Sequence, residues 1–187
     1  MLTHKGTVTL TTRRLVLRRI AVDDVEAMFR NYASDDKVTK YLSWNTYADM
    51  EKLREYVESF IPSYENLEYY HWGITMNGEF IGTINLHAIS NKNEHCELGY
   101  CMGSRWWNNG IMTEAAAEVI RFAFEELNVN KICALHDVEN PASGMVMQKN
   151  GMKREGLLRE HTVRRDGTHG DMAWYAILKS EWNDNGK

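Results

Sequence analysis

One stretch near the middle of the 187-residue chain constrains the fold more than any other. Residues 96–102 form a strand-like apolar run, residues 103–110 form a polar loop that ends in Gly110, and an alanine-rich helix is expected from Thr113 to about Leu127. A helix N-terminus offers unpaired backbone N–H groups and the positive end of the helix dipole. The glycine lets the backbone approach a ligand closely. The stretch therefore predicts a site for a phosphate or diphosphate.

The common nucleotide-binding loops do not fit this stretch. The chain contains no G-x-x-x-x-G-K-[ST] sequence, and no G-x-G-x-x-G follows a predicted strand. Many strand-to-helix turns carry a glycine and bind nothing, so the spacing alone leaves a purely structural turn open. Any anion bound here is held by a different kind of loop.

The rest of the chain predicts a single mixed α/β domain over residues 1–187, with a core from about 11 to 182 and no repeat or linker. Thr46 and Asp49 resemble a capping box, and Asn77-Gly78 is a hairpin signal. Hydrophobic periodicity predicts strands at 11–20, 69–76, 80–90, 96–102, 131–137, 153–163 and 169–178, and helices at 23–32, 48–61, 113–127 and 141–150.

Composition narrows the class of protein. A hydrophobic share of 43% with six Trp and nine Tyr argues against a disordered chain. No apolar run approaches 18 residues, and residues 1–6 lack the apolar segment of a signal peptide, so neither a membrane span nor secretion is expected. The net charge of −4 argues against a general nucleic-acid binder and mildly favours a cationic substrate.

Cysteine and histidine usage indicates a reduced protein without a catalytic metal. None of Cys96, Cys101 and Cys133 forms a C-x-x-C pair, so buried, reduced thiols in a cytoplasmic protein are expected. His95-Cys96-Glu97 reads as H-x-E, but the P-C-x-x-C of a zinc deaminase is absent. The seven histidines are scattered, and no H-E-x-x-H occurs.

The central stretch resembles the cofactor loop of the Gcn5-related N-acetyltransferase (GNAT) superfamily, whose pattern is [QR]-x-x-G-x-[GA]. The pattern covers residues 107–112, with Gly110 as the central glycine. Trp107 replaces Gln or Arg, and Met112 replaces Gly or Ala. The wider context is similar to the Rim-type branch of ribosomal-protein N-terminal acetyltransferases, in which a glycine usually stands at the position of Asn108.

A second block supports the resemblance independently. Asn140 and Ser143 form an N-x-x-S sequence between a predicted strand and a short helix that ends at Gly151. The family has the same order, with an aromatic residue after the glycine, and Met152 fills that position here. The resemblance extends over residues 13–182.

The resemblance implies a central, mostly antiparallel sheet that is splayed between two neighbouring strands at the cofactor cleft and flanked by helices. It also implies acetyl-CoA as the cosubstrate and no metal. In the family the pantetheine arm pairs with backbone groups of the strand before the loop, whereas the sequence alone would indicate only a buried strand there. The cofactor contacts implied in this way are Tyr100, Cys101, Met102, Trp107, Asn108, Asn109, Gly110, Ile111, Met112, Thr113, Asn140 and Ser143.

Two residues are candidates for proton transfer. Many family members use a tyrosine of the short helix as the acid, but the matching Met147 cannot donate a proton. Ser143 is then the candidate acid; alternatively, its hydroxyl binds the backbone or the cofactor. Glu97 is the candidate base, acting through a water; alternatively, it pairs with a polar neighbour.

Other polar and aromatic residues have less certain roles. Glu160 and His136 are further candidate bases, whereas Asp171 matches an aspartate of the branch for which a structural role is expected. Four aromatic residues either line an acceptor cleft or pack the two predicted N-terminal helices against each other, namely Tyr41, Trp44, Tyr47 and Tyr64.

The resemblance leaves three functions open. The first is acetylation of the α-amino group of a protein, for example a ribosomal protein. The second is acetylation of a small amine such as a polyamine, an amino sugar or an amino-acid analogue. The third is binding of acyl-CoA without catalysis. In the first two functions the partner is an amine acceptor rather than a nucleic acid or a membrane, and the oligomeric state, including a homodimer, stays open.

Overall fold

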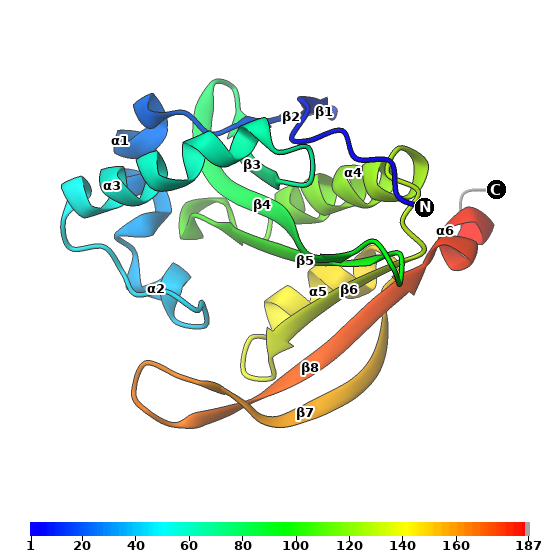
Figure 1. The fold of residues 1–187 in the computed structure, drawn as a ribbon. Coiled ribbons are helices and arrows are strands. Elements are labelled where there is room, and N and C mark those ends of the chain that lie inside the picture. The colour runs from blue at the N-terminus through cyan, green and yellow to red at the C-terminus, as the bar shows by residue number, and fades with distance from the viewer. Residues whose placement is uncertain (186–187) are drawn as a thin grey trace.

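Eight strands form one sheet in the order β1-β2-β3-β4-β5-β6-β8-β7, with helices on both faces, in a computed structural model that describes residues 1–185 (Figure 1). The strands are β1 (Leu10–Thr11), β2 (Leu15–Arg19), β3 (Tyr70–Met76), β4 (Glu79–Ser90), β5 (His95–Met102), β6 (Lys131–Asp137), β7 (Lys153–Val163) and β8 (His169–Leu178). The helices are α1 (Val25–Met28), α2 (Asp36–Thr39), α3 (Met50–Phe60), α4 (Ile111–Glu125), α5 (Pro141–Lys149) and α6 (Lys179–Asn185), with 3-10 turns at Val22–Asp24, Ile61–Glu65 and Ser104–Trp106 and a π-helical turn at Phe29–Ala33.

The first predicted strand, 11–20, is wrong as a single element. The chain reverses at Thr12, whose backbone N–H donates to the Leu15 carbonyl at 2.9 Å and whose Oγ1 accepts from the Leu15 N–H at 3.0 Å. Two short antiparallel strands, β1 and β2, result from this turn. In contrast, the predicted Asn77-Gly78 hairpin is confirmed, because both residues have positive φ angles, 52° and 82°.

The predicted capping box of the second helix is also wrong. Asp49 itself is the N-cap of α3, since its Oδ1 accepts from the Glu51 N–H at 2.8 Å. Thr46 instead shares a 2.6 Å hydrogen bond with the hydroxyl of Thr39. The predicted helix 23–32 is divided into a 3-10 turn, α1 and a π-helical turn. Within residues 1–185, no helix combines the length and the apolar character needed to cross a bilayer.

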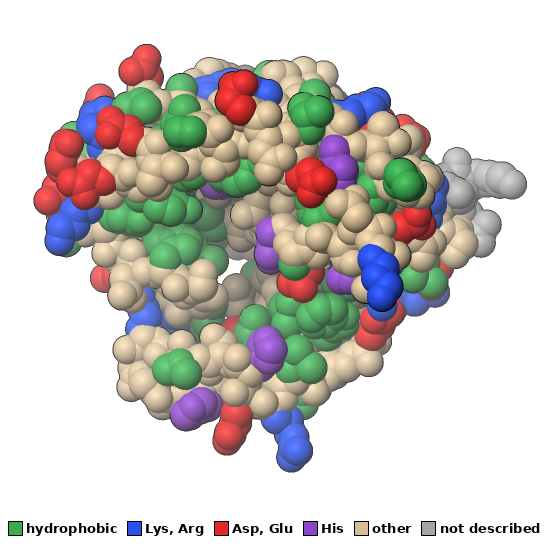
Figure 2. All heavy atoms as spheres, viewed as in Figure 1, with side chains coloured by type: hydrophobic (Ala, Val, Ile, Leu, Met, Phe, Trp, Pro, Cys, Tyr) green, Lys and Arg blue, Asp and Glu red, His purple; other side chains and the backbone are tan. Residues whose placement is uncertain are grey.

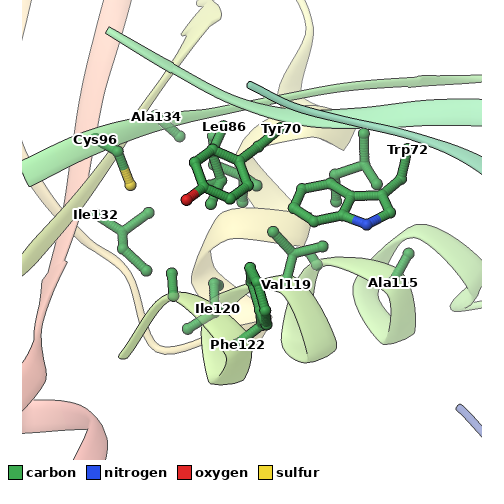
Figure 3. Close-up of a cluster of buried hydrophobic side chains, with 14 of the residues drawn as sticks. Tyr70, Trp72, Leu86, Cys96, Ala115, Val119, Ile120, Phe122, Ile132 and Ala134 are labelled. Carbon is green, nitrogen blue, oxygen red and sulfur yellow. The ribbon is translucent and has the colours of Figure 1, made fainter. Parts of the chain in front are cut away.

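Two hydrophobic clusters hold the helices against opposite faces of the sheet. In the larger one, Tyr70 and Trp72 of β3 pack against Phe122 of α4, with the Trp72 and Phe122 ring centroids 5.8 Å apart (Figure 3). In the smaller one, Val25 of α1 and Leu53 of α3 pack against the other face. Burial of these apolar side chains supplies the main driving force for the layered arrangement.

The sheet is splayed between its two central strands, as expected. β5 and β6 are parallel and pair over three positions only, from His95–Lys131 to Glu97–Cys133. Beyond Glu97 the two strands separate, although β4 remains paired with β5 as far as Met102. α4 makes the crossover connection that a parallel pair requires.

Candidate functional site

A cleft of about 570 Å³ lies where β5 and β6 separate. Its walls are the end of β5, the loop and first turn of α4, one side of α5 along its length and residues 37–42. Every residue that the sequence assigns to the cofactor lines this cleft except Asn109. The Asn109 side chain turns back to the loop and donates to the Trp106 and Trp107 carbonyls.

The loop before α4 contains two left-handed residues. Gly110 is the N-cap of α4 with φ 69°, and Asn108 has φ 61°. Asparagine tolerates this conformation better than other residues with a Cβ. Asn108 can therefore hold this left-handed conformation at a position where the Rim-type branch usually has glycine. The first-turn N–H groups of α4 lack partners within the helix and face the cleft region.

Trp107, one of the two residues that depart from the family pattern, forms a hydrogen bond within the loop region. Its indole N–H donates to the Met102 carbonyl at 2.8 Å, and 41% of the residue is exposed at the cleft. The Met102 carbonyl is therefore already hydrogen-bonded within the protein. Residues 100–102 also pair with β4, so only those of their backbone groups that point toward β6 are open to a ligand in the gap.

An ion pair between residues that lie far apart in the sequence fixes the loop. Arg14 donates from Nε to the Glu114 carboxylate at 2.6 Å and from Nη1 to the Asn109 carbonyl at 3.1 Å. Thr12 Oγ1 donates to the same carboxylate at 2.6 Å. Burial would raise the pKa of Glu114, but the hydrogen bonds from Thr12 and Arg14 lower it below its usual value. No local pattern in the sequence marks this contact, because its partners lie about 100 residues apart.

Three lysines line the cleft and make it suitable for a polyanion. Lys37 and Lys40 come from α2 and the residues after it, and Lys149 comes from the end of α5. A hydrogen bond with Tyr41 raises the pKa of Lys40, so the ammonium form is favoured. Sequence reasoning missed α2 because a four-residue helix is too short to show a periodic pattern.

The four aromatic residues with open roles separate into two groups. Tyr41 lines the cofactor cleft, whereas Trp44 and Tyr47 pack against the cluster between the sheet and α3. Tyr64 is 4% exposed, and its hydroxyl donates to the His71 carbonyl and accepts from the Ile20 N–H. Tyr64 is therefore a packing residue.

Ser143 and Tyr100 connect α5 to β5 across the gap. Ser143 Oγ donates to the Tyr100 hydroxyl at 3.1 Å, and that hydroxyl donates to the Ser143 carbonyl at 2.9 Å. Burial raises the pKa of Tyr100 to about 12, so its phenol stays protonated at neutral pH. Met147, at the family's tyrosine position, is 2% exposed and packs in the core.

Glu97 lies on the opposite face of the sheet from Ser143. Successive side chains of a strand alternate between faces, so Glu97 and Tyr100 of β5 point in opposite directions. Glu97 is the last residue of β5 that pairs with β6, and its carboxylate lies 3.6 Å from Nε2 of His87. It does not line the cofactor cleft.

A second hollow of about 410 Å³ lies on the face of Glu97 and is lined in part by His71, Asn85 and His87. Burial lowers the pKa of His71 to about 4, so its imidazole is neutral. Asn85 Oδ1 is buried without a hydrogen-bond partner among residues 1–185. A Cβ at Gly99, opposite Asn85, would lie 2.6 Å from that oxygen, so the glycine leaves room for the Asn85 side chain.

The remaining candidate bases have structural contacts. His136 Nδ1 lies 2.8 Å from the Asp137 carbonyl, and its ring is buried against Gly144 of α5. Glu160 is exposed, and its backbone N–H donates to Asp171 Oδ1 at 2.8 Å across an irregular part of the β7–β8 pair. In the described part of the chain, no three His, Cys, Asp or Glu side chains are grouped to hold a metal ion.

The comparison with known families agrees with this architecture. A family model described as "Acetyltransferase (GNAT) domain" matches residues 14–153. The chain belongs to the GNAT acetyltransferase family. It is 33% identical over 172 residues to the Bacillus subtilis protein named uncharacterized N-acetyltransferase YoaA, a match that covers 91% of this chain and 96% of the relative. This acetyltransferase is accordingly an acyltransferase that uses acetyl-CoA.

Solved structures share the fold of this acetyltransferase. A GNAT-family acetyltransferase from Bacillus anthracis superposes with a TM-score of 0.80 at 27% identity, covering 92% of this chain and 99% of that one. RimL, described as a ribosomal L7/L12 alpha-N-protein acetyltransferase in complex with coenzyme A, has a TM-score of 0.82 at 20% identity, covering 91% and 98%. At that identity the RimL likeness concerns the fold alone.

The first testable expectation concerns Gly110. Replacing Gly110 with valine should raise the acetyl-CoA dissociation constant at least about tenfold, a loss of roughly 1.4 kcal/mol. A β-branched residue strongly disfavours the left-handed φ of 69°, so the loop would move away from its present position. Isothermal titration calorimetry measures the change. Gly78→Val is the matched control, because Gly78 has φ 82° in a hairpin that does not line the cleft.

Asn140 should bind the cofactor rather than stabilise the helix. Its side chain lines the cleft and makes no capping hydrogen bond to α5. Asn140→Ala should therefore weaken acetyl-CoA binding about tenfold with little change in Tm. Asn150→Ala is the control, because its side chain donates to the Val146 and Thr113 carbonyls and its loss should lower Tm instead. The opposite pattern in calorimetry and thermal unfolding would make Asn140 a structural residue.

Proposed function

We propose that this acetyltransferase modifies the α-amino group of a protein or peptide. The observation that carries the proposal is the gap between β5 and β6. On one face, this gap adjoins a cleft with lysines and a free helix N-terminus. On the other face, Glu97 stands at the last paired position before the gap, and its neighbour His87 lines the hollow over β3 and β4. A thioester held in the gap can therefore be approached by an amine from the face opposite the cofactor.

In this proposal the cofactor residues act through charge and backbone groups. The first-turn N–H groups of α4 and the side chains of Lys37, Lys40 and Lys149 bind phosphate oxygens. Backbone groups of residues 100–102 bind the pantetheine amides, since this edge of β5 has no strand partner among residues 1–185. A backbone N–H at the same edge stabilises the oxyanion of the tetrahedral intermediate.

The proton transfers are assigned to Glu97 and Ser143. The amine nitrogen attacks the thioester carbonyl carbon, and the C–S bond breaks to give an amide and a thiolate. Glu97 accepts the ammonium proton through a water. Ser143 Oγ donates a proton to the departing thiolate, and it regains one from its Tyr100 partner or from solvent. Glu97 passes the ammonium proton on to solvent, and the second proton that nitrogen loses as the amide forms returns through solvent to the Ser143 side. Both side chains then end in their starting protonation states, and one proton is released overall.

The choice of a protein N-terminus rests on two points. The Rim-type resemblance covers the stretch around residues 97–115, and RimL itself is described as an alpha-N-protein acetyltransferase. The hollow lined by His87 also combines a neutral imidazole, an amide and aromatic rings with the carboxylate of Glu68, groups that can bind the backbone of a peptide.

An assay of acetyl-CoA consumption tests the proposal. The panel contains peptides with free N-termini, polyamines, amino sugars and amino-acid analogues, and a thermal-shift measurement with CoA precedes it. Turnover with peptides and slower turnover with the small amines would support the assignment. Turnover only with a small amine would refute a protein acceptor, and binding of CoA without any turnover would refute amine acetylation.

A further inference from the structure

The arm formed by β7 and β8 reaches back to the N-terminal part of the chain. Arg165, in the turn between these strands, donates from Nη1 to Asp36 Oδ1 and from Nε to Asn45 Oδ1, both at 3.2 Å. It also donates from Nη2 to Thr46. These partners lie 119 to 129 positions away in the sequence, so this contact joins two distant parts of the fold.

The turn that carries Arg165 is also fixed to the end of β6 by its neighbour Arg164. Arg164 donates to both carboxylate oxygens of Asp137, at 2.8 and 2.9 Å, and pairs with Glu139 at 2.8 Å. The Asp137 side chain is 2% exposed, whereas the side chain of Asp36 in α2 is 84% exposed. Exposed ion pairs contribute little to stability, so the contact of Arg165 with α2 can open while Arg164 keeps the turn on β6.

The contact of Arg165 with Asp36, Asn45 and Thr46, called the tip contact below, completes a ring around the gap between β5 and β6. Residues 37–42 line the cofactor cleft on one side, and Asn140 and Ser143 line it on the other. The β7–β8 turn joins the two sides, because Arg165 binds Asp36 and Asn45, which flank the 37–42 segment, and Arg164 binds Asp137, three residues before Asn140. Figure 2 shows an opening through the molecule between the part that carries α2 and the β7–β8 arm.

We propose that the ring closed by Arg165 makes this residue a determinant of acceptor specificity: the site takes a primary amine at the end of a narrow, extended chain and excludes amines on bulky or branched groups. The inference rests on the proposed amine acetylation. An acceptor that approaches through a closed ring has to enter end-on, which an unfolded peptide N-terminus or a linear alkylamine can do. An amine on a rigid, wide molecule reaches the gap only when the tip contact is broken.

The experiment compares the kcat/KM values of narrow and wide acceptors. The narrow ones are an unstructured peptide with a free N-terminus and a linear diamine, and the wide one is an amino sugar. The wild type should prefer its better narrow acceptor at least about tenfold over the amino sugar, and Arg165→Ala should reduce that preference about tenfold by raising the rate with the wide amine. The CoA dissociation constant should not change. Arg159→Ala, an exposed arginine on the same arm, is the matched control.

Each result supports or overturns the inference. The inference is supported if Arg165→Ala has a lower kcat/KM ratio of narrow to wide acceptor than the wild type and Arg159→Ala has the same ratio. If Arg165→Ala is active and its preference for the narrow acceptor is unchanged, the role of Arg165 in acceptor specificity is refuted, whereas amine acetylation is not. A weaker CoA affinity without a change in preference also refutes that role, because the tip contact would then serve the cofactor. Absence of turnover with every amine overturns both proposals. The peptide and diamine rates show which narrow acceptor is used.

Discussion

Ser143→Ala should lower kcat about 100-fold while the acetyl-CoA dissociation constant changes little. The hydroxyl lies in the cleft at the start of α5, where it donates to the Tyr100 phenol at 3.1 Å. Alanine removes the proton that this hydroxyl supplies to the thiolate but keeps the helical backbone and most of the side-chain volume. Pre-steady-state measurement of CoA release, together with calorimetry of cofactor binding, separates the chemical step from affinity.

Ser59→Ala is the matched control for this change. Ser59 also carries a helical hydroxyl with a backbone partner, the Tyr56 carbonyl at 2.6 Å, but it is exposed on α3 away from the cleft. Its kcat should equal that of the wild type. If Ser143→Ala instead weakened acetyl-CoA binding and left kcat intact, Ser143 would be a cofactor contact and not an acid.

Glu97→Gln should lower kcat on the order of 100-fold at neutral pH and alter the pH–rate profile. The amide keeps the shape of the carboxylate but cannot accept a proton. The loss of rate that accompanies protonation of this carboxylate at low pH should therefore disappear, and the acidic limb that remains should come from the amine substrate. A pH–rate profile of kcat/KM for both proteins, with Tm as a folding check, gives the result.

Glu155→Gln serves as the control for Glu97→Gln. Glu155 lies on β7 and pairs with Lys131 at 2.7 Å on the surface, so its loss should leave the pH–rate profile unchanged. Full activity in both Ser143→Ala and Glu97→Gln would remove both catalytic assignments. Catalysis would then depend on positioning and oxyanion stabilisation alone, with solvent carrying the protons.

Local patterns in the sequence predicted most of the fold. The strand, loop and helix around Gly110 were predictable because each has a short-range cause: an apolar run, a left-handed glycine and an alanine-rich helix. The first strand was mispredicted because its apolar pattern continues past Thr12, whereas the reversal there depends on one hydroxyl and on pairing with β2. α2 escaped prediction because its four residues are held by tertiary contacts.

The candidate site was less predictable where contacts span the chain. The loop before α4 could be predicted as a strand-to-helix turn from its own residues, with the left-handed Gly110 at its end. The Arg14–Glu114 and Arg165–Asp36 contacts join residues that are 100 and 129 positions apart, so no local pattern marks them. The contact between Tyr100 and Ser143 needed the geometry of the splay itself.

The three paired positions between β5 and β6 also have a mechanical consequence. β1 to β5 form one antiparallel body, and β6, β8 and β7 form another, so the short parallel junction is the only place where strands of the two bodies are paired among residues 1–185. A rotation about that junction would leave every antiparallel rung intact, but it would break contacts that cross between the bodies, among them Tyr100–Ser143 and Arg165–Asp36. The width of the gap is thus set by side-chain contacts and core packing rather than by strand pairing.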